Sequence, residues 1–328
     1  MPHPLTPIFQ SLSIQSPDSI SFEKTPSQTP DSPPFFSRES QQRLILTLRN
    51  TLYHQCYTRP LTALGAFSQM LSEEEDIWQQ LSRANCGHTT WEIGWQIQQI
   101  QSGGNIIAKR GQTRCQIKAG DYAMTFSEDL QPWVGGAIMV CRRKESLTLQ
   151  AGVYYAFGNA RPEGEKQAQI LRFYFHPHPR RAVARIFALI TGYLNGRRVP
   201  FTLKTLMKEE DRDRVDGTVL YLSQTHYLDF VDFLRTTSGE LSSLLKPEVP
   251  LFTKPLHPGI GLAESPKTGE SFGMNRCRLL AEAIAIAWTR GRQDEAARWQ
   301  AATQKFASAG LSLERPYLNP GSSDIYTL

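Results

Sequence analysis

The feature that most constrains the fold is a series of short runs with period-two alternation, each ended by a turn that contains glycine. Between Trp91 and Lys144 these runs cover residues 91–100, 105–110, 113–124 and 136–144. Further runs follow at 148–160, 169–178, 199–206 and 216–223. Runs of this length with turn sequences such as SGG and VGG between them are typical of antiparallel strands. The sequence therefore predicts several hairpin connections.

Other segments place apolar residues at helical spacing instead. We expect amphipathic helices at residues 37–57, 61–84, 180–195, 226–246 and 274–288, because their apolar positions recur every three or four residues. Strands and helices in this mixture favour an α+β fold over a doubly wound parallel sheet. The predicted architecture is a mixed, largely antiparallel sheet flanked by amphipathic helices.

The N-terminal 37 residues differ from the rest of the chain in composition. They are rich in Ser, Pro, Thr and Gln and contain few apolar residues, which predicts a disordered arm. The expected organisation is this arm at residues 1–37, an N-terminal helical and β part at 38–146, and an α+β part with C-terminal helices at 147–328. A Ser- and Pro-rich N-terminus is also typical of type III secretion signals, but composition alone does not support secretion.

Charge and cysteine content exclude several classes of protein. Lys and Arg number 36 against 31 Asp and Glu, so only local clusters distinguish an anion site from an evenly charged surface. The five cysteines are scattered without a CxxC pair, and we expect no metal, no cofactor and no disulfide framework.

The apolar stretch around residues 182–194 contains Arg185 and is shorter than the roughly 20 residues of a membrane span. We expect a cytoplasmic protein without a membrane or nucleic-acid partner.

The strand at residues 171–176 is the strongest candidate for a ligand site. Alternation places Leu171, Phe173 and Phe175 on one face, and on the other it places Arg172, Tyr174 and His176. The second set is either the exposed polar face of a half-buried sheet or a row of groups that bind an anion.

Lys204 is central in the next candidate strand, at residues 199–206. Two interpretations stay open: an edge-strand charge that prevents sheet addition, or a general base that is desolvated beside other cations. Further cations lie in loops and at a helix start. Arg161 and Lys166 belong to one glycine-containing loop and Lys254 to another, while Arg276 and Arg278 are expected in the first turn of a helix, where an anion is favoured.

Long segments of the second half resemble the HopA-type family of type III effector proteins. They are GVYYAFGNARPEGEKQ, LRFYFH, VPFTLKTL, DGTVLYL and VPLFTKPLHPGIGLAESPKTGESFGMNRCRLLAEAI, in this order, and the resemblance extends over residues 147–288. It implies one of two functions. Similar proteins in class V lanthipeptide biosynthesis are implicated as lyases that eliminate phosphate from phosphoserine or phosphothreonine, whereas plant-pathogen effectors of the family act as non-catalytic binding modules.

Of these two functions, the lyase suits the candidate residues better. Elimination requires a base for the Cα proton, an acid or electrophile, and cations that hold the leaving phosphate. Our hypothesis assigns Lys204 as base and His176 as acid. Arg161, Arg172, Arg276 and Arg278 would hold the phosphate, and Tyr174 and Lys254 would orient the substrate. The expected partner is a phosphorylated or acidic peptide or protein, together with a kinase that phosphorylates the peptide.

Overall fold

The computed structural model describes residues 3–22, 37–61, 77–125, 131–161, 169–179, 182–211 and 213–328. Its described residues confirm the α+β class and the largely antiparallel sheets. The helical segments are α1 (Thr6–Ser11), α2 (Arg38–Thr51) with the π-helical turn η1 (Leu52–Tyr57), α3 (Ile77–Ala84), α4 (Ala182–Gly196), α5 (Tyr227–Leu244), α6 (Phe272–Thr289) and α7 (Glu295–Ser308).

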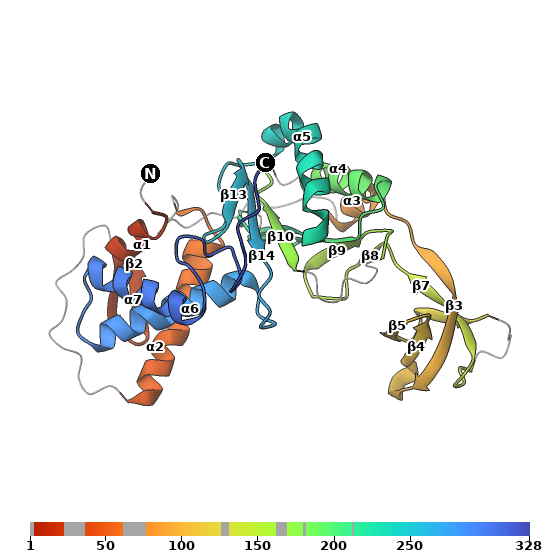
Figure 1. Ribbon diagram of the computed structural model, residues 1–328, viewed down its shortest axis with the longest axis horizontal. Helices are drawn as coiled ribbons and strands as arrows, with labels where there is room; N and C mark the ends of the chain where they lie inside the picture. The colour runs from red at the N-terminus through yellow and green to blue at the C-terminus, as the bar shows by residue number, and fades with distance from the viewer. Residues whose placement is uncertain are drawn as a thin grey trace.

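The central sheet contains seven strands in the order β13-β14-β10-β12-β11-β9-β8, and every neighbouring pair is antiparallel. Its strands are β8 (Glu145–Ser146), β9 (Val153–Phe157), β10 (Ile170–Phe175), β11 (Phe201–Leu206), β12 (Thr218–Ser223), β13 (Lys254–His257) and β14 (Ile260–Glu264). Helices α3, α4 and α5 lie above this sheet, and α1, α2, α6 and α7 lie to its left (Figure 1). The expected boundary between residues 146 and 147 stays a prediction.

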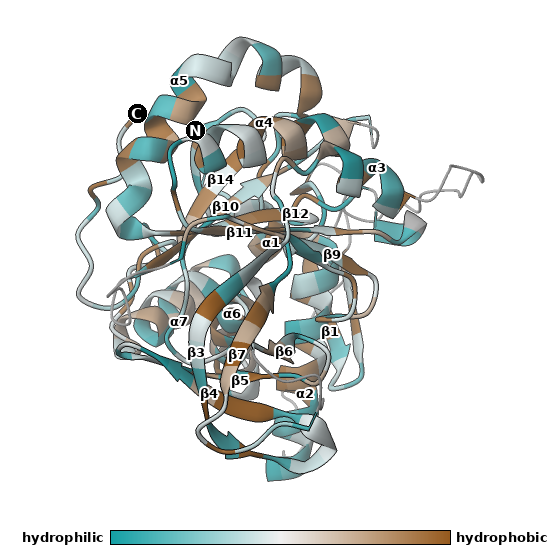
Figure 2. Ribbon diagram, turned by 90° about the vertical axis from the view of Figure 1, so that its right-hand side faces the viewer, coloured by the Kyte–Doolittle hydropathy of each residue, from teal (hydrophilic) through white to brown (hydrophobic). Residues whose placement is uncertain are grey.

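A separate five-stranded sheet lies on the opposite side of the molecule from α7 (Figure 1). Its order is β5-β4-β3-β7-β6, formed by β3 (Thr90–Ile100), β4 (Ile106–Arg110), β5 (Thr113–Ile117), β6 (Tyr122–Met124) and β7 (Ala137–Arg142). The register of β3 against β7 shifts between Glu92 and Trp95, where Gly94 has a φ of +84°. This bulge turns Trp95 into the small core of the sheet while Ile93 stays exposed. Figure 2 views this sheet in front of the central one.

Part of the N-terminal segment is ordered, unlike the arm that its composition predicts. Residues 3–22 form α1 and a hairpin of β1 (Leu12–Ser16) with β2 (Ser19–Phe22). Phe9 is fully buried against Trp299 of α7, with ring centroids 4.8 Å apart, and Arg298 donates a hydrogen bond to the Phe9 carbonyl at 2.6 Å. A few apolar side chains therefore dock this segment. Residues 23–36 lie outside the described residues.

Two further expectations concern helices. The helix expected at residues 61–84 is observed at Ile77–Ala84, and residues 62–76 lie outside the described residues. Within the described chain, no helix combines the length and the apolar character that crossing a bilayer requires.

The C-terminal strap, residues 311–328, is held by two buried charged side chains. Glu264 of β14 is fully buried and accepts hydrogen bonds from the Asn319 amide, the Ser322 hydroxyl and the Tyr326 hydroxyl, at 2.6, 2.7 and 2.6 Å. Arg276 of α6 donates to the carbonyls of Pro316 and Leu318 at 2.7 and 2.9 Å. A buried carboxylate that accepts three hydrogen bonds leaves three donors without partners when it is removed.

We expect Glu264→Ala to lower the free energy of unfolding by about 3 kcal/mol, because several buried donors lose their acceptor at once. Urea denaturation followed by circular dichroism measures this loss, and limited proteolysis reports release of the strap. Glu314→Ala is the matched control, since Glu314 is an exposed carboxylate in the same segment. Equal unfolding free energies for the two variants would contradict the role of Glu264.

Candidate functional site

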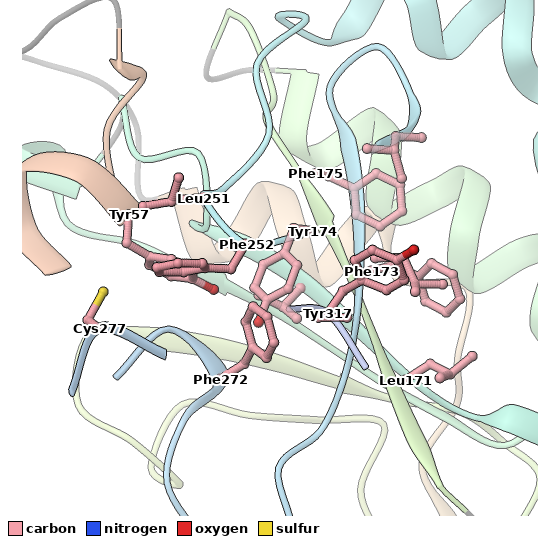
Figure 3. Packing of buried hydrophobic residues seen from close by; sticks show 14 of the residues in the cluster. Tyr57, Leu171, Phe173, Tyr174, Phe175, Leu251, Phe252, Phe272, Cys277 and Tyr317 are labelled. Atoms are coloured by element: carbon pink, nitrogen blue, oxygen red, sulfur yellow. The ribbon is translucent and has the colours of Figure 1, made fainter. Parts of the chain in front are cut away.

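The two faces of β10 have different surroundings. Leu171, Phe173 and Phe175 are fully buried on one face, where the ring of Phe173 lies 3.7 Å from that of Phe230 on α5. Tyr174 points the other way, toward Tyr57 and Phe272, as Figure 3 shows. The alternation expected for this strand is thus confirmed for residues 171–175.

Arg172 and Lys204 lie on the same face of the central sheet. In the register, Arg172 is opposite Tyr221 of β12 and Lys204 is opposite Val219, two residues away on the same strand. The Arg172 guanidinium carbon and the Lys204 ammonium nitrogen lie 5.4 and 5.6 Å from the centroid of the Tyr221 ring. All three side chains are partly exposed. We call Arg172, Lys204 and Tyr221 the Tyr221 site.

No carboxylate within the described part of the chain forms an ion pair with either cation of the Tyr221 site. Arg172 donates instead from Nε to the Ser265 hydroxyl at 3.0 Å, and Lys204 also lies 6.0 Å from the centroid of the Tyr155 ring. Cation–π contacts of this kind contribute about 0.5–1 kcal/mol each at partly exposed positions. The site therefore carries positive charge that is available to an anion.

Protonation states at this site follow from burial and from neighbouring hydroxyls. Burial alone would lower the pKa of Arg172, but interactions with Tyr174, Tyr221 and Tyr57 outweigh burial and raise it. Burial raises the pKa of Tyr174 to about 12, although Arg172 opposes this shift. Arg172 is consequently a fixed cation and Tyr174 a neutral hydroxyl near pH 7.

Lys204 is not an edge-strand charge. Strand β11 lies between β12 and β9 in the interior of the sheet, so its backbone is hydrogen-bonded on both sides and no protection against strand addition is needed there. That interpretation is wrong, and the lysine points from a central strand into the Tyr221 site.

His176 does not join this site. It follows the last residue of β10, has an exposed fraction of 1%, and lies with Nδ1 3.5 Å from a carboxylate oxygen of Glu248. Its backbone is bonded to Gly259 and Lys246, and neither ring nitrogen has a hydrogen-bond partner among the described residues. Burial lowers the pKa of His176, against an opposing contribution from Glu248.

Arg161 lies in a different cluster. Its guanidinium donates to both carboxylate oxygens of Glu92, with the Nε bond at 2.8 Å, and stands 5.0 Å from the centroid of the Trp95 ring. Arg110 and Arg142 approach the same carboxylate at 3.6 and 3.5 Å. Lys166, from the same predicted loop, lies outside the described residues.

The remaining predicted cations have structural partners. Lys254 forms an ion pair with Asp324 of the C-terminal strap at 2.8 Å, and burial lowers the pKa of Arg276, which binds the same strap, to about 10. Arg278 pairs with Glu270 and Glu282 at 2.9 and 2.8 Å. Because α6 begins at Phe272, Arg276 and Arg278 are beyond its first turn, and the expected helix-start position is wrong.

Among the predicted residues that the structure describes, only Arg172, Tyr174 and Lys204 thus share one face of one sheet. Sequence reasoning missed Tyr221, to which both cations point. Its signal is the alternation in TVLYLS, where Leu220 and Leu222 are buried on the opposite face. The described residues contain no group of three or more His, Cys, Asp or Glu side chains that would hold a metal.

The buried imidazole predicts a pH dependence of stability. The lowered pKa of folded His176 means that the unfolded chain, with a value near 6.5, binds more protons just below that pH. The free energy of unfolding should therefore fall as the pH drops below about 6.5, by at most about 1.4 kcal/mol per pH unit. Urea denaturation at a series of pH values measures this slope.

In His176→Gln the slope between about pH 6.5 and pH 5 should become smaller by the share of this imidazole, while His3, whose pKa burial also lowers, keeps its own share. His54→Gln is the control because His54 is exposed, and it should keep the slope of the parent chain. A His176→Gln variant with an unchanged slope would show that another group causes the pH dependence.

No curated protein sequence matches the chain. Two solved effector proteins from Pseudomonas syringae are similar in structure. The one from pathovar tomato strain DC3000 has a TM-score of 0.39 and 17% identity over 51% of this chain and 62% of that one. The one from pathovar syringae strain 61 has a TM-score of 0.41 and 10% identity over 86% and 91%.

The chain therefore spans less than two thirds of the first of these proteins, and both likenesses are distant. The family comparison is more direct. The model of the HopA1 effector protein family matches residues 144–318, which is more than half of the 328 residues and includes Arg172, Lys204 and Tyr221. The chain belongs to the HopA1 effector protein family.

Proposed function

We propose that this protein binds a phosphorylated serine or threonine of a peptide at the Tyr221 site and eliminates the phosphate. The observation that carries the proposal is the meeting of two cations, Arg172 and Lys204, at one tyrosine ring without a carboxylate partner in the described structure. A phosphate group carries close to two negative charges at pH 7, so two neighbouring cations suit it better than they suit a single carboxylate.

Lys204 is the proposed base and Arg172 the proposed phosphate ligand. In the proposed step Lys204 first gives up its ammonium proton to solvent, and the amine then takes the Cα proton. The electrons of that C–H bond form the Cα–Cβ double bond, and the Cβ–O bond breaks so that inorganic phosphate leaves. Arg172 offers a planar fork that binds two phosphate oxygens, and its Ser265 contact fixes that fork. Tyr174 lies beside Arg172 as a neutral hydroxyl and would orient the substrate.

The proposal no longer uses His176 as an acid. Phosphate leaves as a stable anion, since the second pKa of a phosphorylated side chain is about 6, and its departure does not require a proton from the enzyme. Arg161, Lys254, Arg276 and Arg278 are likewise not assigned to the phosphate, because each is engaged by a carboxylate or by backbone carbonyls.

The expected partners are the phosphorylated peptide and the kinase that produces it. The five cysteines are free thiols, which supports work in a reducing cytoplasm. The second candidate is a non-catalytic, effector-like module in which the same cations bind an acidic surface; both solved neighbours are described as effector proteins. The experiment below distinguishes the two.

We expect the purified protein to convert phosphoserine in a synthetic peptide to dehydroalanine, with release of phosphate that mass spectrometry detects. Lys204→Ala should reduce the rate by at least about 100-fold, as expected for loss of a general base. Arg172→Gln should mainly weaken binding, by about 10-fold or more, because a charge-assisted bond is lost.

Lys109→Ala is the matched control, since Lys109 is an exposed lysine within a strand of the other sheet. It should retain the full rate, and thermal unfolding should confirm that all variants are folded. Binding that depends on Arg172 without any elimination would favour the module, and turnover unaffected by Lys204→Ala would remove this lysine from the mechanism.

A further inference from the structure

A cavity of about 600 Å³ lies where one end of the central sheet meets the five-stranded sheet. The central sheet contributes the end of β9 at Phe157, the start of β11 at Phe201, and Tyr221 of β12. The other wall comes from β5 and β7, with Ile117 and Val140. Ligand pockets typically enclose about 300–1,000 Å³, so this cavity can hold several side-chain groups.

Partly buried hydrogen bonds and an ion pair hold the two walls of the cavity together. Arg142 of β7 donates to the carbonyls of Gly158 and Ala160, just after β9. Glu92 of β3 binds Arg161 across the same junction, and it also pairs with Arg142 within the five-stranded sheet. Burial alone would raise the pKa of Glu92, but Arg161 and Arg110 outweigh burial and lower it, so this carboxylate stays charged. These contacts hold the two walls in place without a ligand, so the cavity is preformed.

The lining combines an apolar floor with excess positive charge. Ile117, Val140, Leu149, Phe157, Ile170 and Phe201 supply the apolar surface. Lys118, Arg142, Arg143 and Arg161 line the cavity together with two carboxylates, Asp121 and Glu145. Glu92, which is not part of the lining, pairs with Arg142 and Arg161, so four lining cations stand against three carboxylates. Such a lining suits a large apolar side chain that is followed by an acidic group.

The cavity is continuous with the Tyr221 site. Tyr221 and Thr202 line the cavity, and the Tyr221 ring also contacts both cations. The lining residues Pro200, Phe201 and Thr202, at the start of β11, lie two to four positions before Lys204. Because an extended chain rises about 3.3 Å per residue, a peptide held at Lys204 reaches the cavity within about two to four residues.

We propose that this cavity is a specificity subsite. It selects phosphorylated peptides that carry a large apolar residue, followed by an acidic one, about two to four positions from the phosphorylated residue. The subsite rests on the proposed function, because it assumes that the phosphate occupies the Tyr221 site. The apolar side chain enters between β5, β7 and the ends of β9 and β11, and the acidic group meets Arg143 and Lys118 at the rim.

Two series of fluorescein-labelled peptides test the subsite. One series contains phosphoserine for turnover, and the other contains its phosphonate analogue, whose carbon–phosphorus bond prevents elimination and allows binding to be measured by fluorescence anisotropy. Each series places Phe-Glu, Phe-Ala or Ala-Ala two, three or four positions from the phosphorylated residue, on either side. At one spacing, Phe-Glu should bind at least about tenfold more tightly than Ala-Ala.

Arg143→Glu should remove the advantage of the Glu and leave that of the Phe. Arg143 is 58% exposed and pairs with Asp121 at 2.7 Å, so the variant is expected to fold. Arg185→Glu is the matched control: Arg185 is 55% exposed in an ion pair with Glu240 on the helical layer, and its reversal should leave both preferences intact.

The outcomes separate the subsite from the lyase. The subsite is overturned if peptides with Phe-Glu, Phe-Ala and Ala-Ala have equal dissociation constants at every spacing and on both sides of the phosphorylated residue. This holds whether or not phosphate is eliminated. An anchor preference with the phosphonates but no elimination from the phosphoserine series supports the subsite and overturns the lyase. A preference that Arg185→Glu changes as strongly as Arg143→Glu does would also overturn the subsite.

Discussion

The alternation of β10 is the constraint on which the rest of the structure depends. Leu171, Phe173 and Phe175 are fully enclosed on the side of α4 and α5, so Arg172 and Tyr174 must point to the other face. A register slip of one residue would place Arg172 among the helices and move three apolar side chains to the face of Tyr221 and Lys204. Residues that are opposite each other in an antiparallel pair point to the same face. The pairing of β10 with β12 and of β12 with β11 therefore places Tyr221 and Lys204 on the face of Arg172. One buried face thus fixes the Tyr221 site on the opposite face.

Local patterns were sufficient to predict this part of the molecule. The strands at residues 171–175 and 201–206 follow from period-two alternation, and the facing of Arg172, Tyr174 and Lys204 follows from the same pattern. The pattern could not extend to His176, because the strand ends at Phe175 and the chain turns toward Lys246 and Gly259. Alternation predicts the direction of a side chain only while the strand continues.

The environment of the other cations could not be predicted from the sequence, because their partners are distant in the chain. Lys254, Arg276 and Arg161 pair with residues 40 to 70 positions away, namely Asp324, the carbonyls of Pro316 and Leu318, and Glu92. A sequence pattern cannot distinguish an arginine that binds a distant carbonyl from one that awaits a ligand. The same limit applies at the N-terminus, where composition averaged over residues 1–37 hides the few apolar side chains that dock residues 3–22 on α7.

The electrostatic repulsion between Arg172 and Lys204 destabilises the folded protein when no anion is bound, and this supports a ligand at the Tyr221 site. Two partly desolvated cations close to one ring repel each other, and cation–π contacts offset this repulsion only in part. Val219, opposite Lys204 on the same face, indicates that an apolar β-branched residue is accommodated there. If the sheet needed only stability, such a residue would serve better than Lys204 at the centre of an interior strand. A dianionic phosphate would satisfy both cations at once, and their placement on hydrogen-bonded strands means that little ordering is needed when it binds.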